Sequence, residues 1–188
     1  MLTVLLLSTV ALSAASKSSF TFSSDPEEVV LLVTYIGGTI GIHPTFRLYG
    51  DGRLEYVLAD VHGKEFERHE GSLDFQEVEN ILRVAVESNL LEISEDGIKS
   101  KLKAQNPTGD VPRITDATSM IIMISLTSFK KRGEEFGPTS NQLTVHAPTI
   151  LERYYDIPEI HGCAILSRRM SALQRSFKTG TDSPTLKN

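Results

Sequence analysis

The residues whose types and spacing could most readily bind a metal are His62, Glu65 and His69, in the pattern His-x-x-Glu-x-x-x-His. Zinc takes imidazole nitrogens and carboxylates, and a catalytic zinc keeps one position open for water. On a helix the three side chains would share a face and form the centre of a small metal-dependent hydrolase. The surrounding residues 61–71 are polar and glycine-bounded, however, and predict a turn or edge strand, where positions seven apart face opposite sides. We therefore favour solvated surface histidines and keep the hydrolase as the alternative.

The rest of the chain contains no recognisable catalytic or cofactor-binding pattern. His161 and Cys163 could be a base and a thiol nucleophile, but residues two apart on a helix point away from each other. Cys163 is better explained as a small buried hydrophobe. There is no Walker loop, no G-x-G-x-x-G and no G-x-S-x-G. The sequence therefore predicts no catalytic residue and no cofactor.

The charge distribution argues against a nucleic acid as the main partner. The net charge is −5, but residues 17–160 carry 14 basic and 23 acidic side chains, whereas residues 161–188 carry five basic and one acidic. Recognition of a phosphate backbone needs a basic face, and the body of this chain is acidic. The basic C-terminal segment has one apolar face at helical spacing, which favours packing on its own domain over docking to a membrane surface.

The first residues have the pattern of an export signal. Residues 1–15 are a short apolar run that ends in small side chains, with Ser13 and Ala15 at the −3 and −1 positions of a cleavage point after Ala15. The run is shorter than the about 20 residues that span a bilayer, so we expect no stable membrane span after its removal. These features predict a periplasmic or secreted protein. No Lys or Arg precedes the run, and a retained N-terminus would instead indicate a cytosolic interaction protein.

The remainder divides into a linker, one domain and a tail. Residues 16–28 are polar and serine-rich and predict a linker. Residues 29–178 hold the periodic hydrophobic patterns and are long enough to bury one core, and residues 179–188 predict a disordered tail. Cys163 is the only cysteine, so no intramolecular disulfide can form and the core must supply the stability.

Three strands are predicted in the first half of the domain. Residues 29–36 form a β-branched run typical of a buried strand. Residues 45–58 alternate apolar and polar side chains on both sides of Asp51-Gly52, which predicts a β-hairpin. Residues 61–70 favour a polar edge strand.

An amphipathic helix is predicted after the hairpin. Asp74 and Glu77 form a capping box, and apolar residues recur at helical spacing. Asn89 is suited to the left-handed conformation that commonly ends a helix.

Residues 94–115 are rich in turn signals. Within them, residues 99–103 alternate lysines with other side chains, which indicates a short edge strand kept soluble by charge.

The last part of the domain predicts two more strands and two helices. Residues 118–127 have the composition of a central strand, and residues 142–147 that of a last strand. Pro148 and Pro158 each begin a predicted helix, the second weakened near its start by Gly162. The predicted fold class is α+β, with a mostly antiparallel sheet of about five strands, one packed helix and C-terminal helices.

The order of these elements resembles a class of exported bacterial proteins of unknown function. In that class a Y-x-DG hairpin precedes an amphipathic helix and a T-D-x strand, matched here by Tyr49–Gly52, the helix from Asp74 and Thr115–Ala117. The likeness covers residues 45–127, and a cysteine-containing element that precedes the hairpin in some members is missing. The resemblance implies export and a small α+β domain.

The function expected from these patterns is that of an exported, non-enzymatic binding or structural domain. Its partner would be a protein or another component of the cell envelope, bound through a sheet edge or loops. No ligand class and no oligomeric state is singled out by the residues.

Overall fold

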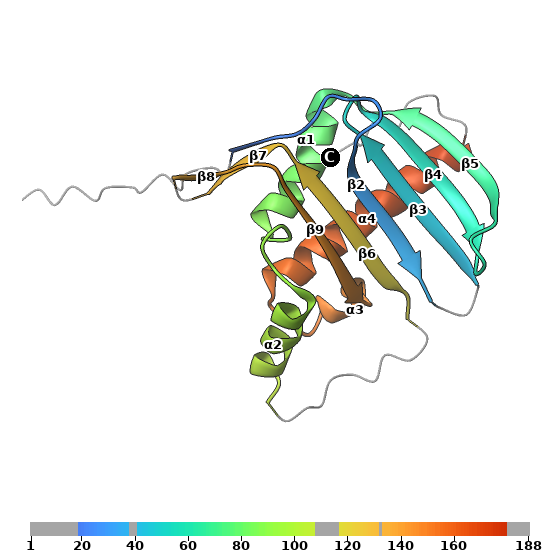
Figure 1. The fold of residues 1–188 in the computed structure, drawn as a ribbon. Helices are drawn as coiled ribbons and strands as arrows, with labels where there is room; N and C mark the ends of the chain where they lie inside the picture. Colours follow the sequence, from blue (N-terminus) through green and yellow to red (C-terminus); the bar gives the residue numbers. More distant parts are fainter. Residues whose placement is uncertain (1–18, 38–40, 108–116, 132, 180–188) are drawn as a thin grey trace, which may run out of the picture.

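A six-stranded antiparallel sheet dominates the α+β fold, as expected, with one strand more than predicted. The computed structural model describes residues 19–37, 41–107, 117–131 and 133–179. The strand order is β5-β4-β3-β2-β6-β9 (Figure 1). The strands are β2 (Val29–Ile36), β3 (Ile42–Tyr49), β4 (Arg53–Asp60), β5 (Glu65–Ser72), β6 (Ser119–Leu126) and β9 (Thr139–His146).

The hairpin of β3 and β4 forms where the sequence predicts it. Gly52 has a φ of 91°, and its N–H donates to the Tyr49 carbonyl at 3.0 Å. Leu48 pairs with Leu54 across the turn, which fixes the register of both strands. Glycine is required at this turn because the positive φ is costly for other side chains. Strand β5 then adds the predicted polar edge.

A second, three-stranded sheet, β1-β7-β8, projects from one side of the main sheet (Figure 1). Its strands β7 and β8 continue β6 and β9 beyond a bend, and β1 pairs with β7. The rings of Phe129 and Phe136 stack with centroids 4.7 Å apart and give this small sheet an aromatic centre. The strands are β1 (Ser19–Thr21), β7 (Ser128–Lys131) and β8 (Glu134–Phe136).

Strand β1 lies inside the segment 16–28 that was predicted to be a linker. The folded domain therefore begins no later than Ser19 rather than at Val29. The physical reason is long-range pairing: Phe20 lies opposite Phe129 on β7. Local composition does not reveal a partner that is so distant along the chain.

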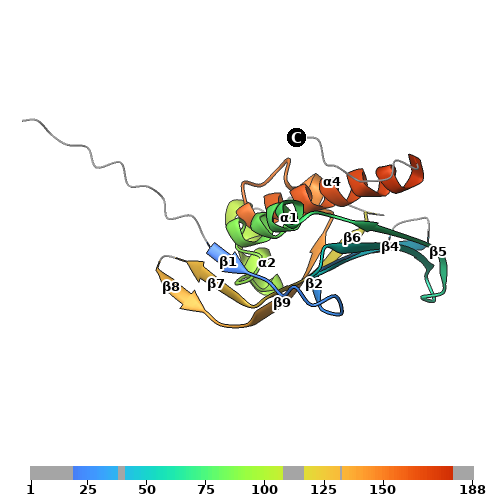
Figure 2. The same ribbon diagram turned by 90° about the horizontal axis from the view of Figure 1, so that it is seen from above.

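Two helices cover one face of the main sheet, α1 (Phe75–Glu87) and α4 (Pro158–Thr179), with the short α3 (Pro148–Leu151) beside α4 (Figure 2). The predicted capping box of α1 is present, because Glu77 N donates to Asp74 Oδ1 at 2.8 Å and Asp74 N donates to Glu77 Oε2 at 3.2 Å. Asn89 is in the left-handed region with a φ of 59° and follows the end of α1, as expected.

Residues 95–105 form helix α2 (Glu95–Gln105), which corrects the predicted lysine-rich edge strand. Ser94 caps the helix through a hydrogen bond from Gly97 N to its Oγ at 3.1 Å. Acidic residues occupy the first turn and Lys103 the last turn, so the charges complement the helix dipole. The cap and the charge order outweigh the alternation of lysines that suggested a strand.

The core lies between the main sheet and helices α1 and α4. Helix α4 passes through Gly162 without a break, contrary to the weakening predicted there. A Cβ at position 162 would overlap the Ser88 side chain at the end of α1. Glycine thus lets the two helices approach closely, and that packing outweighs its low helix propensity.

No helix among the described residues is long and apolar enough to cross a membrane. The predicted signal peptide at 1–15, residues 180–188 of the predicted tail, and Thr115 and Asp116 of the T-D-x match lie outside the described residues.

Candidate functional site

The predicted metal-binding residues lie in or just before strand β5, and the two in the strand engage separate partners. His62 occupies the turn between β4 and β5. Glu65 pairs with Arg68 at 2.7 Å, and His69 contacts Glu67 at 2.7 Å. In the parts of the chain that the structure describes, no group of three His, Cys, Asp or Glu side chains could hold a metal ion. The geometry therefore gives no support to a zinc site here.

Cys163 is buried in the α4 side of the core. Burial, with the Glu159 carboxylate nearby, raises the pKa of its thiol to about 12. Because the thiolate is the nucleophile, this thiol is unreactive near neutral pH. His161 instead contacts Asp156 at 3.3 Å, and the buried Glu159 carboxylate pairs with Lys101 of α2 at 2.6 Å. These contacts tie helices together and do not build a Cys–His pair.

A serine–histidine hydrogen bond that sequence reasoning missed joins β6 to β9. Ser119 Oγ and His146 Nδ1 lie 3.1 Å apart on directly paired residues. Only the strand register brings these side chains together, since they belong to no sequence motif. A serine becomes a nucleophile with a base that a third group orients and with donors for the oxyanion. The hydrogen bond by itself does not define an active site.

Among the described residues, no helix lies on the face of the main sheet opposite α1 and α4, which we call the open face (Figures 1 and 2). The register of the six strands aligns side chains from every strand into rows on this open face. One row runs from β9 to β5 through Gln142, Met123, Leu32, Arg47, Glu55 and Glu70. The row is apolar in the β2–β6 half of the sheet and charged in the β3–β5 half.

The charged half of the open face centres on Glu55, which is only 5% exposed. Three guanidinium groups surround its carboxylate: Arg53 at 2.7 Å, Arg47 at 3.4 Å and Arg68 at 3.9 Å. Burying a carboxylate is costly unless it is paired and hydrogen-bonded, and this cluster supplies the pairing. We call these four residues the Glu55 cluster.

Tyr49 completes one side of the Glu55 cluster. The Arg53 guanidinium lies 3.7 Å from the centre of the Tyr49 ring, in a cation–π arrangement. Partial burial raises the pKa of the Tyr49 hydroxyl. The hydrogen bond with Glu55 and the negative charge of Glu55 raise this pKa further. The Arg53 guanidinium also donates to the Pro26 carbonyl at 2.8 Å, which fastens the segment before β2 to the hairpin.

The apolar half of the open face holds a hollow of about 460 Å³, here called the central hollow. Its lining includes Val29, Leu32 and Met123, with Arg47 at the side of the Glu55 cluster. Met123 is 46% exposed. The volume is within the range of small-molecule binding pockets, roughly 300–1,000 Å³.

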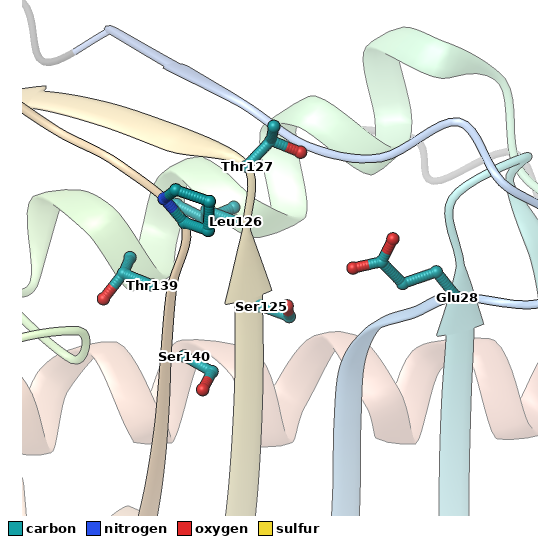
Figure 3. Close-up of a pocket in the computed structure, with 7 residues that line it drawn as sticks. Glu28, Ser125, Leu126, Thr127, Thr139 and Ser140 are labelled. Atoms are coloured by element: carbon teal, nitrogen blue, oxygen red, sulfur yellow. The ribbon is translucent and has the colours of Figure 1, made fainter.

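A second hollow of about 350 Å³ continues the central hollow toward the bend into the small sheet. The two share Ser125 and Ser140. Figure 3 shows the Glu28 carboxylate directed toward β6, where Ser125 lies, with Thr127 just beyond the end of the strand. This polar hollow therefore has an acidic and hydroxyl-rich lining, whereas the lining of the central hollow adds the apolar side chains of Val29, Leu32 and Met123.

No protein-family model matches this chain, and no curated protein matches it in sequence. The candidate site is therefore defined by its own geometry. It consists of the open face of the main sheet, with the central hollow between the Glu55 cluster and strand β9.

Proposed function

We propose that the protein is an exported, non-enzymatic binding domain and that the open face of the main sheet is its binding surface. The observation that carries this proposal is the central hollow, with Leu32 and Met123 in its lining, on a face that no helix of the described residues covers. The expected partner is a protein or another component of the cell envelope.

The composition of the open face supports a binding role. An antiparallel sheet with one solvated face normally alternates apolar and polar side chains, with the polar ones outward. Here Leu32, Ile121 and Met123 all lie on the outward rows of β2 and β6. Of the three, Met123 is exposed and Leu32 and Ile121 are half-buried. Apolar groups that reach solvent side by side mark interaction sites more often than scattered ones do.

The absence of a catalytic constellation from the described residues fits a binding role better than the alternative of a metal-dependent hydrolase. Glu65 and His69 engage separate partners, His62 lies in the turn before β5, and burial raises the pKa of the Cys163 thiol to about 12. Export rests on the signal pattern of residues 1–15 and on the resemblance to exported proteins.

Binding at the open face is tested with the neutral apolar dye Nile red and two matched variants. Met123→Asp places a charge in the central hollow, whereas Tyr154→Asp changes an exposed aromatic residue in the turn after α3. We expect saturable dye binding by the native chain, a loss of at least about tenfold in affinity for Met123→Asp, and unchanged affinity for Tyr154→Asp. Equal affinity for all three proteins would overturn the proposed binding surface.

Export and lack of turnover are tested separately. The intact mass of the protein in each fraction of its native host should reveal a form that begins near Ser16 in the periplasm or medium. A full-length cytosolic chain would favour the cytosolic interaction protein instead. Turnover of ester, peptide or glycan substrates that is lost in Ser119→Ala or in His69→Ala would contradict the non-enzymatic assignment.

A further inference from the structure

Arg47 connects the Glu55 cluster to the central hollow, because it belongs to the first and lines the second. Arg53 holds Glu55 Oε1 at 2.7 Å and Arg68 holds Glu65 at 2.7 Å. Arg47 has the looser contact, 3.4 Å to Glu55 Oε2, which is longer than the usual N–H···O distance of about 2.7–3.2 Å. The charge of Arg47 is thus the least neutralised of the three.

A guanidinium in this position suits a carboxylate ligand. It carries five N–H donors in a planar fork, which can bind both oxygens of a carboxylate. Glu55 Oε2 engages one terminal nitrogen of Arg47, and the side chain is 29% exposed beside the hollow. A ligand carboxylate could therefore complete the coordination of Arg47 without displacing Glu55.

The strand register sets the direction and length of such a ligand. Arg47, Leu32, Met123 and Gln142 follow one another on the adjacent strands β3, β2, β6 and β9. Neighbouring strands are about 4.8 Å apart, so this row extends about 14 Å from Arg47 to Gln142. The middle of the row is apolar, and Gln142 offers a polar end next to solvent.

Charge fixes the orientation of the ligand. Glu28 lies in the polar hollow, which meets the central hollow at Ser125 and Ser140. A carboxylate is repelled by Glu28 and attracted by Arg47, so its apolar chain must extend from Arg47 across Leu32 and Met123.

We infer that the central hollow binds an amphipathic monocarboxylate of medium chain length, with its carboxylate on Arg47 and its apolar chain across Leu32 and Met123. This inference rests on the proposed function and names the ligand class of the same site. A fatty-acid-like ligand satisfies the single guanidinium and the apolar middle of the row together, whereas an extended peptide would add unpaired backbone groups over Leu32 and Met123.

The test is displacement of Nile red from the full chain at pH 7.5 by three ligands that differ in head group alone: decanoate, decanol and decyltrimethylammonium. The chain contains no tryptophan, so the dye signal is free of tryptophan emission. We expect decanoate to displace the dye at a concentration about tenfold lower than decanol, because it adds a charge-assisted hydrogen bond. The cationic ligand should be weaker than decanol.

Two matched variants assign the preference to Arg47. Arg47→Gln should bring decanoate and decanol to equal affinity, whereas Arg68→Gln, which removes another arginine of the Glu55 cluster that does not line the hollow, should keep the tenfold preference. Binding to Arg47 should also lower the pKa of bound decanoate, measured with carboxyl-labelled ligand by carbon NMR in the native chain.

The outcomes separate this inference from the proposed function. Dye binding that depends on Met123 but shows equal displacement by decanoate and decanol would overturn the carboxylate assignment and leave the binding surface intact. Dye binding that does not depend on Met123 would overturn both. Tighter binding of an acetylated apolar peptide with one terminal carboxylate than of decanoate would overturn the small-ligand assignment.

Discussion

The two faces of the main sheet are built from alternate residues of the same six strands, yet one face is buried under helices and the other is partly exposed. On the helix side, Met120, Ile122 and Ile124 of β6 are fully buried under α1 and α4. On the open side, Ile121 and Met123 between them stay partly or largely exposed. The difference shows that β6 carries more apolar surface than the core can cover. On our proposal, that excess is the binding surface.

The largest expected effect is the difference in stability loss between alanine substitutions at two adjacent residues of β6, one on each face of the sheet. Ile122→Ala should lower the free energy of unfolding by about 3 kcal/mol, because it opens a cavity under the helices. Ile121→Ala should cost less than about 1 kcal/mol, since its side chain keeps partial contact with water. Urea unfolding of the two variants measures this difference, and both variants remove the same side-chain volume. Equal losses would mean that the open face is covered in solution.

The helix side also depends on the close approach of α4 to the end of α1. Gly162→Ala places a Cβ against Ser88, and we expect a loss of about 2 kcal/mol from the forced shift. Thermal or urea unfolding measures it. Gly137→Ala, where nothing lies within 4 Å of the added Cβ, is the neutral control.

A second variant distinguishes steric overlap from helix propensity at Gly162. Adding Ser88→Gly to Gly162→Ala removes the overlapping side chain and should recover most of the lost stability. No recovery in the double variant would contradict the close approach of the two helices.

Local signals predicted most of the fold because they act over a few residues. The Asp51-Gly52 turn, the Asp74–Glu77 capping box and the alternation around the hairpin each have a short-range physical cause, and all three are present. The structure pairs Arg47 with Glu55 across this hairpin. The sequence predicts the hairpin but not this register, so the contact was not part of the prediction.

Long-range pairing accounts for what the sequence did not reveal. Strand β1 exists because Phe20 lies opposite Phe129, and the open-face row requires the order of all six strands. The exposure of Met123 follows from which face of β6 the helices cover. Ser119 and Ser125 share its outward face, but the apolar run 120–124 between them is typical of a strand that is buried on both sides. Helix α2 differs, because its signals are local: the Ser94 cap and the acidic first turn favour a helix over the same residues in which the lysine alternation indicates a strand.

The next largest loss of stability is expected on the open face, from a substitution in the Glu55 cluster. Glu55→Gln leaves three arginines without their shared counter-charge, and we expect a loss of about 1.5 kcal/mol. This is less than the about 3–5 kcal/mol for breaking a fully buried pair, since the arginines remain 29–46% exposed. Unfolding in urea at low salt measures it, with Glu70→Gln as the control on the paired position of β5. Equal effects of the two variants would mean that Glu55 is not the anchor of the cluster.

The smallest expected effect is a loss of stability at alkaline pH, caused by ionisable groups that are buried on the helix side of the sheet. Cys163 has a pKa raised from 9.0 to about 12 by burial, with Glu159 nearby, and burial likewise raises the pKa of Tyr35 to about 12. A raised folded pKa stabilises the protein fully below the unfolded pKa, and the contribution is lost as pH rises from about 9 to about 12. Between pH 8 and pH 10 the Cys163 thiol alone should therefore cost about 1 kcal/mol. Urea unfolding at the two pH values measures this slope, which Cys163→Ala should reduce and which Ser119→Ala on the open face should leave unchanged. An unreduced slope in Cys163→Ala would mean that the thiol titrates normally in the folded protein, and that the core beneath α4 is more open to water than its packing indicates.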